Sequence, residues 1–156
     1  MGSRDLYTEL DACKYLFLQE AREPQTNTLH MFLQEGRVSE RTARREVGGM
    51  ILEGHPVEID DATKSFEILW PSYIAYVVTN ESFALDDDPP DTYEGRRFRR
   101  YFQSRLLQQV KDNNRLSDEY PGPLLHFRIV CEHHLVDVIS TQSPTVRRVN
   151  PREPIN

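Results

Sequence analysis

The sequence predicts an α+β fold, with a mainly antiparallel sheet of about five or six strands and two principal helices packed on it. Two stretches, 65–78 and 125–139, alternate with the period of two that is typical of strands. Two others, 5–22 and 96–112, carry apolar residues at helical spacing. Strands and helices do not alternate regularly along the chain, which favours antiparallel pairing over a parallel α/β sheet.

The first predicted helix spans residues 5–22. Its apolar residues recur every three or four positions and form one stripe: Leu6, Leu10, Cys13 and Phe17. Pro24 then ends the helix, because proline disfavours helical backbone in the residue before it. We expect this helix to be well buried against the sheet.

Short strands are expected next. Residues 28–33 alternate and predict the first of them. Residues 38–47 are polar and rich in arginine, so a short helix and an exposed loop both fit them. Two further short strands are predicted at 50–52 and 57–59.

Residues 65–82 form the longest stretch that is typical of buried sheet. Phe66, Ile68 and Trp70 alternate with other residues as in a half-buried strand. Pro71 lacks an N–H and marks a bend. Residues 73–78 are apolar on both faces, which predicts a central, doubly covered strand. The two strands would pair with each other or form one long kinked strand.

The charged residues between 83 and 105 are unevenly placed. An acidic loop, 83–95, precedes five arginines on the predicted helix 96–112, whose apolar stripe would face the core. Four arginines at the start of a helix are disfavoured by the helix dipole, so something must offset them. Local neutralisation by the acids is one explanation, and a charged docking surface for another protein is the other. The predicted docking residues are Asp86, Asp87, Asp88, Asp91, Glu94, Arg96, Arg97, Arg99 and Arg100.

The C-terminal part predicts a hairpin. Residues 125–131 and 135–139 alternate, and a short polar segment, 132–134, separates them. Residues 1–146 are then expected to form a single globular domain, followed by an extended tail at 147–156.

Composition fits a soluble globular protein of 156 residues, with 38% hydrophobic and 28% charged residues. The net charge of −6 argues against general nucleic-acid binding, which needs a basic surface. The first residues hold no apolar segment of the kind a signal peptide needs, so we expect a cytoplasmic protein. Two cysteines, Cys13 and Cys131, are too few for a disulfide framework and are expected to be free and buried.

Aromatic residues offer a candidate ligand pocket, with core packing as the alternative explanation. The candidate lining residues are Trp70, Tyr73, Tyr76 and His126.

The sequence predicts no catalytic residue, no metal site and no cofactor. His133 and His134 are adjacent, and on a strand they would point to opposite faces rather than to one ion. The spacing of Asp86, Asp87 and Asp88 does not match a calcium-binding loop.

Three segments resemble small bacterial proteins of the toxin-immunity type: SYIAYVVTNESF, EGRRFRRYFQSRLL and YPGPLLHFRIVCEHHLVDVIS. The resemblance covers about residues 65–146 and consists of fold-determining residues. It implies a protein-binding role and transfers no active site.

The first hypothesis is therefore a small acidic cytoplasmic module, an immunity or inhibitor protein that blocks a partner through a charged surface. A basic toxin or nuclease is the expected partner, because opposite charge steers association. One alternative is a small-molecule-binding domain or enzyme with the aromatic-lined pocket. Another is a nucleic-acid-associated regulator that uses the arginine-rich helix. We expect a binding protein rather than an enzyme.

Overall fold

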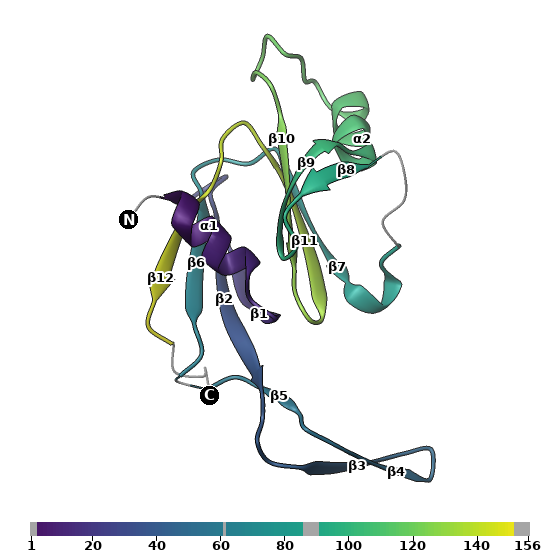
Figure 1. Cartoon of the computed structure of the whole chain (residues 1–156). Coiled ribbons are helices and arrows are strands. Elements are labelled where there is room, and N and C mark those ends of the chain that lie inside the picture. Colours follow the sequence, from purple (N-terminus) through teal and green to yellow (C-terminus); the bar gives the residue numbers. More distant parts are fainter. Residues whose placement is uncertain (1–2, 61, 86–90, 152–156) are drawn as a thin grey trace.

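The computed structural model describes residues 3–60, 62–85 and 91–151, which form two antiparallel sheets and a separate hairpin (Figure 1). The first sheet has the order β1–β2–β6–β12, with β5 paired to the end of β2: β1 (Tyr15–Arg22), β2 (Leu29–Val38), β5 (Val57–Glu58), β6 (Ser65–Trp70) and β12 (Thr145–Val149). The second has the order β7–β11–β10–β9–β8: β7 (Ala75–Asn80), β8 (Thr92–Glu94), β9 (Phe98–Gln103), β10 (Leu125–Val130) and β11 (His134–Ser140). The hairpin consists of β3 (Ala43–Val47) and β4 (Met50–Gly54).

The core lies between the two sheets, because alternate residues of both point inward. Trp70 of β6 meets Phe127 of β10 edge to face, with ring centroids 6.2 Å apart. Phe98 of β9 stacks on the other side of Phe127 at 5.6 Å. Most of the largest fully buried apolar side chains come from β1, β2 and β6 on one side and β10 on the other: Leu16, Leu29, Met31, Leu33, Phe66, Ile68, Trp70, Phe127 and Ile129. Leu10 of the first helix and Ile139 of β11 complete the set.

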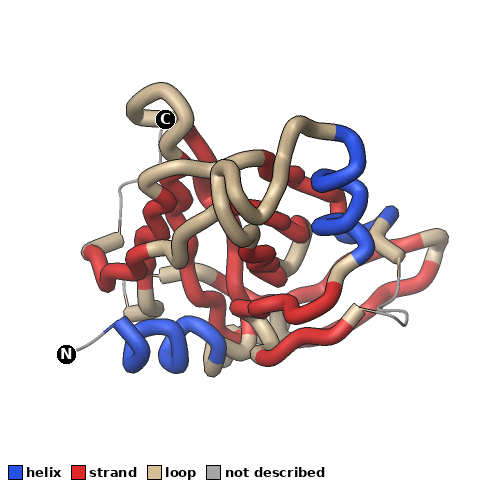
Figure 2. Tube along the Cα trace, turned by 90° about the horizontal axis from the view of Figure 1, so that it is seen from above, coloured by secondary structure: helices blue, strands red, loops and turns tan. Residues whose placement is uncertain are grey.

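Two helices lie on opposite sides of the molecule (Figure 2). In α1 (Ser3–Asp11), Tyr7 contacts Phe98 of the second sheet, and its hydroxyl donates to the Pro144 carbonyl just before β12. Helix α2 (Arg105–Asn113) follows β9 and is capped by Ser104, whose hydroxyl accepts from the Leu107 N–H at 3.0 Å. A single 3₁₀ turn, η1 (Glu81–Phe83), follows β7.

The β3–β4 hairpin, which we call the hairpin arm (43–54), reaches away from both sheets (Figure 1). Its base is closed by the Ser39 N–H, which donates to the Pro56 carbonyl at 2.7 Å. Gly48 and Gly49 form its turn with φ of 60° and 80°, as a two-residue hairpin turn requires. All residues of the arm are exposed.

The prediction of a mostly antiparallel α+β fold with two helices is confirmed, but the prediction of one sheet is wrong, because the strands divide among three. The predicted strand at 28–33 is confirmed from Leu29 onward as the first part of β2, and the predicted hairpin of 125–139 is formed by β10 and β11.

The predicted helix at 5–22 is wrong beyond Asp11. Residues Tyr15–Arg22 form β1, which pairs with β2 along most of its length and has a bulge after Leu18. In residues 38–47, the exposed loop is confirmed only for the irregular stretch 40–42, since Ala43–Val47 is strand β3 and no residue of the segment is helical. In both segments, cross-strand pairing decides the backbone conformation over local pattern.

The prediction for residues 65–82 is wrong in its pairing. Pro71 does mark a break, but β6 and β7 lie in different sheets, so they neither pair nor form one strand. Strand β7 pairs only with β11 in the described part of the chain and lies at a sheet edge rather than at its centre.

The predicted helix at 96–112 is also wrong in its first half. Residues Phe98–Gln103 are strand β9, and helix begins only at Arg105. The arginines at 96–100 therefore lie before and within a strand and not in the first turn of a helix.

The predicted tail begins inside the first sheet, because β12 pairs with β6 from Thr145 to Val149. Within the described ranges, every helix falls short of the length and apolar character that a membrane crossing requires.

Candidate functional site

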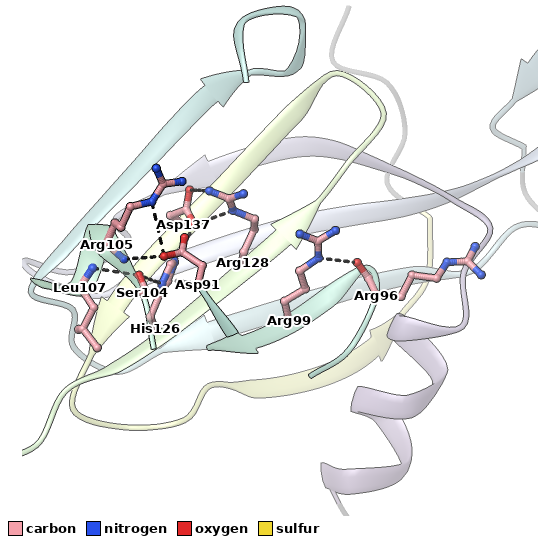
Figure 3. Close-up of polar contacts among 9 residues, drawn as sticks. All are labelled: Asp91, Arg96, Arg99, Ser104, Arg105, Leu107, His126, Arg128 and Asp137. Carbon is pink, nitrogen blue, oxygen red and sulfur yellow. Dashed lines mark hydrogen bonds and ion pairs between the residues drawn. The ribbon is translucent and has the colours of Figure 1, made fainter. Parts of the chain in front are cut away.

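A buried polar cluster joins the start of α2 to the β10–β11 hairpin, and we call it the polar clamp (Figure 3). It consists of Ser104, His126, Arg128 and Asp137. His126 Nδ1 lies 2.7 Å from Ser104 Oγ, and Nε2 lies 2.7 Å from Asp137 Oδ1. Arg128 donates to both carboxylate oxygens of Asp137, at 2.8 and 3.1 Å. The clamp residues Ser104, His126 and Asp137 are at most 6% exposed.

Strand register brings these residues together. Arg128 lies directly opposite Asp137 in the β10–β11 pair, and His126 lies opposite Tyr101 in the β9–β10 pair. Side chains two positions apart share a face, so His126 and Arg128 point away from the core that holds Phe127. The Tyr101 ring stacks on His126 with centroids 4.2 Å apart.

The hydrogen bonds of the clamp form a continuous chain from Ser104 through His126 and Asp137 to Arg128. Asp137 accepts a hydrogen bond from His126 Nε2–H. With the proton of the neutral ring on Nε2, Nδ1 accepts from the Ser104 hydroxyl, so these two bonds assign the tautomer of His126. Burial by itself would raise the pKa of Asp137, but the hydrogen bonds from His126 and Arg128 outweigh it and lower that pKa below its usual value. The buried carboxylate is therefore charged and compensated at neutral pH.

The order Ser–His–Asp is also that of an activated nucleophile. In this protein the Ser104 hydroxyl is buried and accepts the Leu107 N–H as a helix cap. Neither of the two clefts described below has Ser104 among its described lining residues. We interpret the clamp as an anchor that fixes α2 and holds Arg128 in place.

A cleft of about 430 Å³ lies beside the clamp, between α2, β7 and β11, and we call it the α2 cleft. Asp91 accepts from the Arg105 backbone N–H at 2.8 Å and closes one side. Two apolar side chains at its rim, Phe83 and Leu85, are 79% and 80% exposed. The described lining residues are Thr79, Phe83, Ala84, Leu85, Asp91, Arg105, Leu106, Gln109, Arg128 and Leu135.

A second cleft, of about 640 Å³, opens between α1 and the β8–β9 pair. Tyr7, Asp11 and Arg100 line it together with the edges of Phe98 and Phe127. It exposes part of the aromatic core at the end of the sandwich that α1 covers.

The four arginines of the predicted docking surface have different surroundings. Asp11, at the end of α1, accepts three successive N–H groups, from Arg96, Arg97 and Phe98, at 2.6, 2.7 and 2.9 Å. Arg97 turns inward and pairs with Glu132 at 3.1 Å. Arg99 lies over the Tyr93 ring at 4.3 Å and also donates to the Arg96 carbonyl (Figure 3). The Arg97 and Arg99 side chains thus make their contacts within the fold.

The acidic residues are dispersed as well. Asp86, Asp87 and Asp88 lie outside the described residues. Asp91 pairs with Arg105 rather than with the arginines at 96–100. Glu94 lies opposite Arg100 in the β8–β9 pair, and both are exposed.

The four predicted pocket residues do not line either cleft. Trp70 is fully buried between the sheets. Tyr73 and Tyr76 pack edge to face at 4.9 Å near the start of β7. His126 belongs to the polar clamp on the other face of the second sheet. The structure therefore places these residues in three different environments.

The cysteines and histidines lie apart from the clefts. Cys13 and Cys131 are free and buried, as predicted, and burial raises the pKa of each thiol to about 12. His133 is exposed in the β10–β11 turn and contacts the Phe17 ring at 5.8 Å. Across the described ranges, no group of three or more His, Cys, Asp or Glu residues is arranged to hold a metal ion.

The hairpin arm is the feature that sequence reasoning missed. Opposite pairs in its register share a face, so Arg45, Val47, Met50 and Leu52 form one side of the ribbon. The three apolar members of that side are 50%, 66% and 52% exposed. The dipeptide Gly48-Gly49 between two alternating runs was the signal for this hairpin.

Comparison of the chain with family models, curated proteins and solved structures finds no match in any of the three.

Proposed function

We propose that this chain is a protein-binding module of the immunity or inhibitor kind, which blocks a basic partner such as a toxin or nuclease. The observation that carries the proposal is the hairpin arm, which presents an apolar face away from the body of the protein. The resemblance of residues 65–146 to toxin-immunity proteins adds support to it.

The arm has the physical properties of a docking element. A two-stranded ribbon with no third strand is marginally stable in water, so an arm of this length gains from being covered. Val47, Met50 and Leu52 lie on one side of it and are at least half exposed. Fully burying such a side chain contributes about 1.5–3 kcal/mol, and because these three are already partly covered, roughly half of that remains at each. Together the three supply the energy of a binding hot spot.

The charge of the chain supports a basic partner. The net charge of −6 accelerates encounter with a basic protein at low salt and disfavours acidic ones. We also propose a cytoplasmic setting, which agrees with two free buried thiols.

The test is capture from a lysate of the native host, with mass spectrometry of the bound proteins at low and at high salt. Three baits are compared: the wild type, the Met50→Lys/Leu52→Lys double variant, and Ile51→Lys. The first variant places charge on the proposed binding face, and the second places the same kind of charge on the opposite face of the same strand.

We expect one stoichiometric basic protein on the wild type and on Ile51→Lys, with at least about tenfold less on the double variant. High salt should weaken the capture. Equal capture by all three baits, or copurification of only a small molecule or nucleic acid, would reject the proposal.

A further inference from the structure

The outer edge of β7 has the features of a strand-docking site. Among the described strands, β7 pairs with β11 on one side only. Its sequence, AYVVTN, holds no charged residue and no proline, which are the usual means of blocking an edge.

The ladder directs a row of backbone groups outward. The Glu81 N–H donates to the His133 carbonyl of the β11 side. Because antiparallel residues alternate between facing the partner and facing away, Val77 and Thr79 face β11. Tyr76 and Val78 therefore direct their N–H and C=O groups away from the sheet, and Asn80 directs its N–H there, while its C=O belongs to the 3₁₀ turn that it caps.

Apolar side chains surround this row of backbone groups. Val77 and Val78, in the middle of β7, are 44% and 43% exposed. Phe83 and Leu85 follow within a few residues and are about four-fifths exposed. With Thr79, these two line the α2 cleft, so a strand laid along β7 would have the apolar rim of this cleft beside its end.

The charges at the two ends of β7 indicate what fits there. Near its start, the Tyr73 hydroxyl donates to the exposed Glu23 carboxylate. At its other end is the exposed Glu81. An incoming strand would thus meet a carboxylate at each end.

The same charges disfavour a second copy of the chain that pairs in the register centred on Val77. In a twofold antiparallel pairing centred on Val77, residue 81 of one copy lies opposite residue 73 of the other. Glu81 of each copy would then approach the Glu23 that is bound to Tyr73 of the other, and like charges opposite each other are destabilising.

We propose that β7 binds an extended segment of a partner protein by strand addition, and that this segment has a β-branched centre with basic residues at both ends. Main-chain hydrogen bonds to Tyr76, Val78 and Asn80 hold it, and the carboxylates of Glu23 and Glu81 select its ends. This inference rests on the proposed protein-binding function and assigns it a second surface.

The test uses two fluorescein-labelled peptides, KRTVTVTRK and its charge-reversed form EDTVTVTDE, in fluorescence anisotropy with the whole chain. Val78→Pro removes one outward N–H at an edge position, where proline is tolerated. Val78→Thr keeps that N–H and is the matched control. Circular dichroism verifies the fold of both variants, and amide exchange of the wild type gives a readout that needs no variant.

We expect the basic peptide to bind the wild type and Val78→Thr alike, and Val78→Pro and the acidic peptide to bind at least about tenfold more weakly. Bound peptide should slow exchange at the amides of Tyr76, Val78 and Asn80. Binding that Val78→Pro leaves unchanged, protection located elsewhere, or a concentration-dependent dimer that Val78→Pro dissolves would overturn the inference.

The hairpin arm distinguishes this result from the test of the proposed function. Met50→Lys/Leu52→Lys should bind the basic peptide as the wild type does, because β7 lies outside the arm. If the peptide binds and host capture does not depend on the arm, the arm proposal fails and the β7 site stands. If host capture depends on the arm and no peptide protects β7, the arm proposal stands and the β7 site fails.

Discussion

Asp137 is the residue on which the polar clamp depends, because it accepts from both His126 and Arg128. Asp137→Asn removes the charge that compensates Arg128 and replaces one acceptor oxygen with a donor. Removing one partner of a buried ion pair is expected to lower the free energy of unfolding by about 3–5 kcal/mol at pH 7. Urea denaturation measures this loss of unfolding free energy, and Asp118→Asn, at an exposed aspartate, is the control.

The same residue predicts a pH dependence. The pKa of Asp137 is lower in the folded protein than in the unfolded chain, because hydrogen bonds outweigh the effect of burial. Its contribution is therefore complete above the unfolded pKa of about 4 and is lost as pH falls through the folded value. The stability difference between wild type and Asp137→Asn should be constant from pH 7 to about 5 and shrink below about 4. A difference that stays constant into acid would contradict this account.

Some of the clamp was open to prediction from sequence and some was not. The predicted hairpin at 125–139 already implied the neighbouring strands of His126, Arg128 and Asp137. Ser104 was missed because the predicted helix ran through it, although a serine before Arg105-Leu106-Leu107 is a helix-cap signal. His126 was assigned to a pocket because its face could not be assigned without the register.

At the scale of elements, the β8–β9 turn depends on Gly95. This residue has φ of 91°, and a Cβ there would collide with the Phe98 carbonyl oxygen. Gly95→Ala is expected to destabilise the protein by about 2–4 kcal/mol through strain and collision. Gly54→Ala is the matched control, since it has open space for a Cβ and should leave the melting temperature nearly unchanged. Equal melting temperatures for the two variants would contradict the assigned role of Gly95.

The two overextended helices have one physical cause. Leu6 and Leu10 do mark a helix, but Cys13 and Phe17 continue the same spacing inside a loop and a strand. Phe98 and Tyr101 are likewise three residues apart and yet lie on opposite faces of β9. Short apolar runs fit both periods, and long-range pairing chooses between them.

At the scale of the whole molecule, the division into two sheets follows from contacts that local pattern does not contain. Pro71 indicated a break after Trp70, but nothing nearby in sequence shows that β6 pairs with β12 while β7 pairs with β11. Sequence reasoning could give β2, β6 and the β10–β11 hairpin, but not β1, β9, β12 or the sandwich.

Strand β12, at one edge of the first sheet, should contribute strongly to the stability of that sheet. Val146 is 2% exposed and faces the core, whereas its neighbour Thr145 is exposed. Val146→Asp buries a charge without a partner, so we expect the melting temperature to fall by more than about 10 °C, at 2–4 °C per kcal/mol. Thr145→Asp should change it by less than about 3 °C. Calorimetry of both variants measures the difference, and equal shifts would show that β12 does not close the core.

The contacts of α1 also determine when this helix can dock during biosynthesis. The Tyr7 hydroxyl reaches the Pro144 carbonyl, 137 residues further along the chain, and Glu9 pairs with Arg148. At ordinary elongation rates a ribosome needs on the order of ten seconds to travel that distance. Until β12 emerges, β6 lacks one of its two neighbours in the sheet, and α1 lacks its contacts with residues 144 and 148. Helix α1 therefore completes its docking only after β12 has left the ribosome, and until then the nascent chain exposes the surfaces that these contacts later cover.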